Sequence, residues 1–328
     1  MSLLNLLGCP TCRSTLDLDS DDRGWIESGS LKCNSCRRVY PIRAGIPRFV
    51  NSDDYLSNFG MEWTVHARTA FDSHIGEPAS EYMFKTRVGF QPEQLRGSIL
   101  LDAGCGSGRL IEIARMYGAT VVGLDYTIAI ETAAKNLWPD ANVHLVQGDI
   151  LAPPFREEVF DLVFSNGVVH HTPSPPSAFS KLSRLVKRGG EISVWVYPDE
   201  GILGRIPNRA AALYRLLAKR LPLQALYKIC SELQGNIVLP QVLYEDFFST
   251  EKSFKKGHKS PRQAIYVLFP FWSMAPYKEW RIMDTFDFLS AKHKFAYSYD
   301  QVRSWFRKNG MVQVDNLPFP VAVKGRRA

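Results

Sequence analysis

The glycine-rich stretch at residues 98–110 constrains the fold of this chain more than any other segment. It reads SILLDAGCGSGRL, an apolar run followed by an aspartate and three alternating glycines. The apolar run is typical of a strand buried on both faces, and a helical pattern begins at Arg109. Glycines between a strand and a helix let a ligand approach the backbone, where free N–H groups attract its polar parts. The stretch therefore predicts a nucleotide-binding turn.

The spacing of these glycines excludes two common phosphate-binding loops. The dinucleotide fingerprint reads G-x-G-x-x-G and the P-loop needs G-K-[ST], and neither pattern is present here. The pattern D-x-G-x-G-x-G instead resembles motif I of the class I S-adenosylmethionine (SAM) methyltransferases. The resemblance implies that SAM is bound by Asp102, Gly104, Gly106 and Gly108. A plain glycine-rich turn is the alternative interpretation of this motif taken alone.

A second predicted strand, residues 120–124, ends at an acidic residue. Asp125 lies about twenty residues past the glycine turn, where a carboxylate holds a ribose diol through a charge-assisted contact with both hydroxyls. We therefore predict that Asp125 binds the ribose of SAM and that Tyr126 covers the adenine.

The third predicted strand, residues 143–146, is followed by the sequence QGDI. The methyltransferase resemblance implies that Asp149 lies near the adenine amino group and that Ile150 packs on the ring. The alternative for Asp149 is a solvated turn, which the two preceding acids make the weaker interpretation.

The fourth predicted strand, residues 160–164, leads into SNGVVHHTP. This stretch resembles the type 11 methyltransferases, the group that contains the quinone-ring methylases, and the resemblance covers residues 99–197. It implies that Ser165 and Asn166 border the methionine end of SAM.

The double histidine in the same stretch is the candidate general base. Histidine is the natural proton acceptor near neutral pH, so His170 and His171 are predicted to be catalytic, with His171 preferred for contact with the acceptor. The alternative is that one of the two packs or caps while the other is merely exposed.

Four of the six cysteines form two C-x-x-C pairs, which are Cys9, Cys12, Cys33 and Cys36. Pairs at this separation bring four thiolates to one tetrahedral site, as zinc prefers. Disulfides are the poor alternative in a cytoplasmic chain. Residues 31–47 resemble the small zinc ribbons related to the tRNA-methyltransferase activator subunit. A site with four cysteine ligands has no open position for catalysis, so we predict structural zinc, with a stabilising or partner-binding role for the ribbon.

These motifs predict an α/β, Rossmann-like chain with a seven-stranded class I methyltransferase sheet. Residues 1–50 are expected to form the zinc ribbon and residues 51–97 a helical linker or cap. Residues 98–328 are expected to form the methyltransferase domain, with a helical substrate-lid insertion at about 198–295. Nothing resembles a signal peptide or a spanning run, so a cytoplasmic location is expected.

The net charge of +7 is concentrated in one segment. Residues 201–262 hold eleven Lys and Arg against four Asp and Glu, which accounts for the whole excess. This bias predicts contact with an anionic substrate or a membrane surface. Residues 206–221 have the pattern of a basic amphipathic helix; the alternative is that its leucines pack on the core and its charges are simply solvated.

The chain is therefore predicted to transfer a methyl group from SAM to an O, N or C nucleophile of a small molecule, such as a sugar, a quinone or another secondary metabolite, lipid-linked ones included. One alternative is an rRNA or tRNA methyltransferase with an RNA-binding ribbon. It is less favoured because the segment after strand four is SNG and not N/D-P-P-Y, and because Cys105 and Cys230 are badly placed for cytosine chemistry. The other is a non-catalytic SAM-fold protein that binds a partner.

Overall fold

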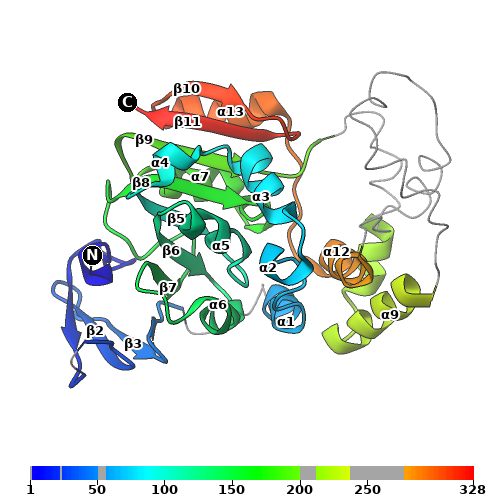
Figure 1. Cartoon of the computed structure of the whole chain (residues 1–328), viewed down its shortest axis with the longest axis horizontal. Helices are drawn as coiled ribbons and strands as arrows, with labels where there is room; N and C mark the ends of the chain where they lie inside the picture. Colours follow the sequence, from blue (N-terminus) through cyan, green and yellow to red (C-terminus); the bar gives the residue numbers. More distant parts are fainter. Residues whose placement is uncertain (1, 23, 51–56, 200–211, 237–276) are drawn as a thin grey trace. The chain divides into compact units, whose positions relative to one another are not determined.

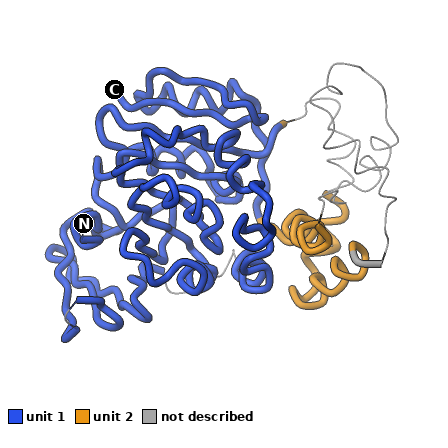
Figure 2. The backbone as a smooth tube through the Cα atoms, viewed as in Figure 1, with its two compact units in different colours: residues 1–198, 293–328 blue, residues 199–292 orange. Residues whose placement is uncertain are grey.

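A computed structural model describes the chain apart from residues 1, 23, 51–56, 200–211 and 237–276. The described residues divide into two compact units, shown in Figure 2. The first joins residues 1–198 to residues 293–328, and the second is residues 199–292.

The first unit is built on a sheet with the order β10-β11-β9-β8-β5-β6-β7 among the described residues (Figure 1). Neighbours from β7 to β9 pair in parallel, whereas β11 is antiparallel to both β9 and β10. This is the predicted class I methyltransferase sheet. The strands are β5 (Ile99–Ala103), β6 (Thr120–Asp125), β7 (Val143–Gln147), β8 (Phe160–Asn166), β9 (Val186–Trp195), β10 (Met311–Asn316) and β11 (Ala322–Arg327).

Helices cover both faces of this sheet. On one face α7 and α13 contribute Phe179 and Phe306 to the core, and on the other α5 and α6 contribute Ile111 and Ile130. The helices and helical turns of this unit are α1 (Ser57–Val65), α2 (Asp72–Ile75), α3 (Ala79–Met83), η2 (Phe84–Val88), α4 (Pro92–Leu95), α5 (Arg109–Met116), α6 (Ala129–Leu137), η3 (Val169–His171), α7 (Pro175–Ser183) and α13 (Tyr299–Lys308).

The N-terminal ribbon folds as four antiparallel strands in chain order, preceded by a short turn. Its core is continuous with one face of the large sheet, since Leu7 and Leu31 belong to the same buried cluster as Phe155. Figure 1 shows the ribbon beside β7. Its elements are η1 (Leu3–Asn5), β1 (Leu16–Asp19), β2 (Ser28–Cys33), β3 (Val39–Arg43) and β4 (Ile46–Pro47).

The second unit contains α9 (Leu223–Asn236) and α12 (Lys278–Ser290). The two helices pack through rings and a buried hydrogen bond: the Tyr227 and Phe286 ring centroids are 5.5 Å apart, and Gln234 Nε2 donates to Thr285 Oγ1 at 2.7 Å. Of the helix predicted at residues 206–221, residues 206–211 lie outside the described residues, residues 212–218 are helical, and residues 219–221 form a turn. None of the described helices has both the length and the hydropathy needed to span a membrane.

Candidate functional site

The glycine turn lies at the carboxyl end of β5 and has the backbone conformation that its sequence requires. Gly104, Gly106 and Gly108 have φ values of 95°, 53° and 91°, which favour glycine. A Cβ at Gly104 would lie 2.4 Å from Val168 Cγ2. The turn is therefore a bare-backbone cradle that leads directly into α5.

Trp63 of α1 covers this cradle. A Cβ at Gly106 would lie 3.0 Å from Cε2 of the Trp63 indole ring, so only glycine lets the ring approach the backbone this closely. The aromatic-rich segment before the glycine motif is the sequence signal for such a cover, although sequence alone does not distinguish it from a core contact.

The Asp125 carboxylate ties the end of β6 to the glycine turn. Its Oδ2 accepts a hydrogen bond from Gly106 N at 2.8 Å, and its Oδ1 accepts from Thr127 N at 2.9 Å and Thr127 Oγ1 at 2.8 Å. Asp125 is only 9% exposed. The predicted ribose ligand is thus held in a fixed orientation beside the cradle.

The other two predicted acids end the strands on either side of β6. Asp102 lies in β5 and is 3% exposed; burial, and after it the negative charge of Asp125, raise its pKa well above the ordinary value. Asp149 follows β7, and burial raises its pKa although its Oδ1 accepts a hydrogen bond from Leu151 N at 2.8 Å. Three carboxylates therefore line one buried edge, which favours a cationic ligand.

The end of β8 supplies the remaining predicted cofactor contacts. Ser165 is 1% exposed, and its hydroxyl donates to Ala103 O at 2.8 Å, which joins β8 to β5. Asn166 Nδ2 donates to Met83 Sδ at 3.5 Å. Asn166 Oδ1 is buried and has no hydrogen-bond partner within the described part of the chain. A buried acceptor without a partner is costly, so this oxygen fits a donor supplied by a ligand.

His171 is held by a backbone carbonyl from a distant part of the chain. Its Nδ1 lies 2.8 Å from His293 O. Because a carbonyl only accepts, Nδ1 carries the proton and the neutral ring leaves Nε2 as a proton acceptor. His171 also lies against Phe59 and Tyr197, with ring centroids 5.0 Å and 5.4 Å away.

His170 is fully buried, and its ring centroid lies 4.0 Å from that of Tyr197. Neither ring nitrogen has a hydrogen-bond partner in the described residues. Burial, followed by the electrostatic influence of the neighbouring His171 and Lys294 side chains, lowers the pKa of His170 well below the ordinary value of 6.5. We therefore expect His170 to stay neutral in the folded protein.

This burial predicts a pH dependence of stability. Below pH 6.5 the unfolded chain protonates His170 and the folded chain does not, so stability is present above that pH and falls as the pH drops. Between pH 7 and 5.5 we expect the wild type to lose roughly 1 kcal/mol more unfolding free energy than His170→Phe. Urea unfolding at each pH measures this, with the exposed His74→Phe as control. Equal losses in the wild type and His170→Phe would contradict the assignment.

An aromatic wall next to the histidines is contacted by two cations, Arg87 and Lys294. It extends from Tyr197 through Trp195 to Phe319, with ring centroids 5.6 Å and 5.7 Å apart. The Arg87 guanidinium carbon lies 4.1 Å from the Trp195 centroid and 3.9 Å from that of Phe319. Such a wall suits a planar or apolar group better than a flexible polar one.

The four ribbon cysteines converge on one point, and their sulfur atoms all lie within 4.8 Å of one another. Cys9 Sγ is 3.6 Å from Cys36 Sγ, and Cys12 Sγ is 3.4 Å from Cys33 Sγ. Tetrahedral zinc with Zn–S bonds of about 2.3 Å places its sulfurs about 3.8 Å apart, so the cluster fits a structural zinc ion.

The ribbon contacts the cofactor edge through Arg48 and Phe49. Arg48 NH1 donates to Gln147 Oε1 at 2.9 Å and its NH2 pairs with Glu131 at 2.9 Å, while Phe49 N donates to Gln147 O at 2.8 Å. Gln147 is the register partner of Asp125, and its Nε2 donates to Tyr126 O at 3.0 Å. The ribbon is thus connected through Gln147 to Tyr126, the residue predicted to cover the adenine.

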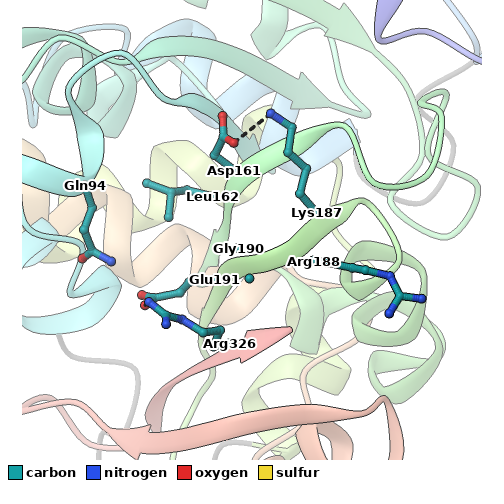
Figure 3. Close-up of a pocket in the computed structure, with 9 residues that line it drawn as sticks. Gln94, Asp161, Leu162, Lys187, Arg188, Gly190, Glu191 and Arg326 are labelled. Atoms are coloured by element: carbon teal, nitrogen blue, oxygen red, sulfur yellow. Dashed lines mark hydrogen bonds and ion pairs between the residues drawn. The ribbon is translucent and has the colours of Figure 1, made fainter. Parts of the chain in front are cut away.

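A cavity of about 300 Å³ lies at the starts of β8 and β9 (Figure 3). Four of its charged groups pair with one another: Lys187 Nζ lies 2.8 Å from Asp161 Oδ1, and Glu191 pairs with Arg326 at 3.5 Å. Because it lies at the amino ends of the parallel strands, it is separate from the edge that carries the predicted residues.

The structure therefore brings the predicted cofactor residues and both histidines to one edge of the sheet, and the four cysteines to a second site in the ribbon. Their roles toward SAM and the acceptor remain predictions. Sequence reasoning missed Gln147 and Thr127 as supports of the edge, as well as the His293 carbonyl. Gln147 had a signal, because it opens the QGDI motif; the other two had none.

Comparison with known proteins identifies two regions. Residues 101–194 match the family described as "Methyltransferase domain", and residues 2–45 match the family described as "Trm112p-like protein".

Individual relatives match only part of this chain. An uncharacterized chloroplastic methyltransferase of Arabidopsis thaliana is 26% identical over 62% of this chain and 64% of its own length. The sterol 24-C-methyltransferase of Saccharomyces cerevisiae is 34% identical over 37% of this chain and 32% of its own length. A tRNA U34 carboxymethyltransferase of Pseudoalteromonas translucida is 38% identical over 33% and 35%. The chain spans less than two thirds of the length of each relative.

Proposed function

Because residues 101–194 belong to the methyltransferase-domain family and residues 2–45 to the Trm112p-like family, we propose that this chain transfers a methyl group from SAM to an O, N or C nucleophile of a small molecule. The observation that carries the proposal is the edge formed by β5, β6, β7 and β8. There a bare glycine turn and three carboxyl groups occur together with Asn166 Oδ1, which has no hydrogen-bond partner among the described residues.

The donors and acceptors at this edge match the chemistry of SAM. When bound, SAM supplies an electrophilic methyl group on a sulfonium ion. Asp125 would accept the ribose hydroxyls, while Asp149 and Ile150 would hold the adenine. Asn166 Oδ1 would accept from the methionine ammonium, which gives this buried oxygen its missing partner. The buried carboxylates would compensate the positive charge of the cofactor.

His171 is the residue that would handle the proton of the acceptor. With SAM bound, the nucleophile would form a bond to the methyl carbon, the C–S bond pair would stay with sulfur, and His171 Nε2 would accept the proton of an acceptor hydroxyl. The His293 carbonyl fixes the tautomer in which Nδ1 carries the proton and Nε2 carries the lone pair. The remaining contribution of the protein is to align the two reactants and to exclude water.

His171→Ala should lower turnover about 100-fold and leave SAM affinity within about twofold of the wild type, because general-base catalysis contributes typically 10²–10⁴-fold. Single-turnover methyl transfer and calorimetric titration with SAM measure the two quantities. Exposed His74→Ala is the control. An equal loss of turnover and SAM affinity would contradict the base assignment.

The acceptor class follows from the wall beside the histidines. Tyr197, Trp195 and Phe319 suit a planar or apolar molecule with an anionic substituent near Arg87. A tRNA acceptor is the second candidate, supported by the tRNA-modifying relative. Against it, the residues outside 201–262 hold equal numbers of basic and acidic side chains, 29 each, whereas RNA binding favours a basic surface.

Labelled SAM distinguishes the two acceptors. The full chain is incubated with a metabolite extract and, separately, with total tRNA. We expect label in a small-molecule fraction that resists ribonuclease. Label confined to ribonuclease-sensitive material would replace the small-molecule acceptor with tRNA. No label in either, together with no heat on SAM titration, would refute the enzyme proposal and leave a partner-binding role.

A further inference from the structure

The helical residues 212–218 in the second unit turn their leucines outward. Leu213, Leu216 and Leu217 are 59%, 56% and 54% exposed. They are spaced i, i+3, i+4 and therefore share one face of the helix. The alternative expectation that the leucines of this segment pack on the core is wrong for these three residues.

The opposite face of the same helix contacts its own unit through small and polar groups. Ala218 is 6% exposed, the Arg215 guanidinium donates to Ala291 O, and Lys219 Nζ donates to Lys292 O at 3.0 Å. The neighbouring α9 buries Leu226 and Cys230 at 3% and 0% and leaves Ile229 43% exposed. The unit therefore has a packed interior, and Leu213, Leu216 and Leu217 are the most exposed of its described leucines.

We propose that this leucine face, Leu213, Leu216 and Leu217, binds the surface of a bilayer that contains anionic phospholipids. An apolar helix face bordered by basic side chains is the pattern of a helix that lies in the membrane interface. The exposed Arg220 follows the face directly, and the described residues 212–236 hold four basic side chains against one acidic one. Anionic headgroups attract such cations within a Debye length of the surface.

The same charge bias disfavours a second copy of this chain as the occupant. In a symmetric dimer the same face of each copy meets the other, so the Arg220 side chains of both copies would lie in one interface. The inference does not depend on the proposed methyl transfer, because it concerns a surface and not the cofactor edge.

Vesicle co-sedimentation of the full chain tests the proposal. Vesicles of phosphatidylcholine alone are compared with vesicles that contain one quarter phosphatidylglycerol. We expect binding to the anionic vesicles that weakens with added salt, and an affinity loss of at least about tenfold in Leu213→Glu/Leu217→Glu. Arg220→Glu should weaken binding to the anionic vesicles alone. Val312→Glu, at an apolar residue of β10 that is 44% exposed, is the matched control and should bind like the wild type.

Three results would overturn the proposal. One is the absence of sedimentation with anionic vesicles, and another is unchanged binding by the double glutamate variant. The third is a wild-type dimer in light scattering that the same variant converts to monomer, because this would assign the face to a second copy of the chain.

Discussion

Asp125→Ala is expected to weaken SAM binding at least about 100-fold. The carboxylate is proposed to hold both ribose hydroxyls, and charge-assisted hydrogen bonds contribute about 1.5–3 kcal/mol each. The same group fixes the glycine turn, because it accepts from Gly106 N at 2.8 Å and from Thr127 N at 2.9 Å. The variant therefore loses ligand contacts and the orientation of the cradle together. Isothermal titration of the full chain with SAM measures the loss.

A second strand-end acid provides the control for general damage to the sheet. Asp161 lies at the opposite edge, where its Oδ2 accepts from Ile99 N at 2.9 Å and its Oδ1 pairs with Lys187. Asp161→Ala should lower thermal stability and leave SAM affinity within about threefold of the wild type, since no cofactor contact is assigned to it. A SAM affinity loss of the same size in both variants would mean that Asp125 acts through folding alone.

The positions of the parallel strands along the chain could be predicted from sequence because most of them are short apolar runs that end at a polar residue. The predicted end of the second strand at Asp125 agrees with β6. The apolar pattern of residues 191–197 predicts a fifth strand from Glu191, whereas β9 begins at Val186. The pairing of β9 with β8 shifts register between Phe160 and Leu162, opposite the stretch that contains Gly189 and Gly190.

Contacts between distant segments could not be predicted in the same way. The His293 carbonyl reaches His171 across 122 residues, and nothing in a backbone oxygen marks it in the sequence. Arg48 reaches Gln147 across 99 residues, although each residue taken alone looks like an ordinary polar surface position. Local patterns identify strands and motifs, whereas supports of this kind depend on tertiary packing.

Removal of zinc is expected to have the second large effect. Ribbon residues such as Leu7 and Leu31 share a buried cluster with Phe155, which lies on the large sheet's side of the same unit between β7 and β8. A module of this size has little core of its own, so its folding depends on the metal. We expect zinc chelation, or Cys33→Ser, to lower Tm by about 10 °C or more, because structural zinc contributes several kcal/mol at least. Differential scanning calorimetry measures the shift. Cys230→Ala, a cysteine outside the cluster, controls for substitution of a buried thiol.

A further variant, Arg48→Met, separates two roles of the ribbon. If it only stabilises the fold, SAM affinity below the melting temperature should be insensitive to breaking its contact with β7. If the ribbon also supports the cofactor edge, Arg48→Met should retain zinc and yet weaken SAM binding about three- to tenfold. The reason is that Arg48→Met removes the bonds to Gln147 and Glu131, and Gln147 is the register partner of Asp125. Zinc content by atomic absorption and SAM affinity by calorimetry, measured on one preparation, decide between the two roles. Full zinc with wild-type affinity in Arg48→Met would limit the ribbon to stability.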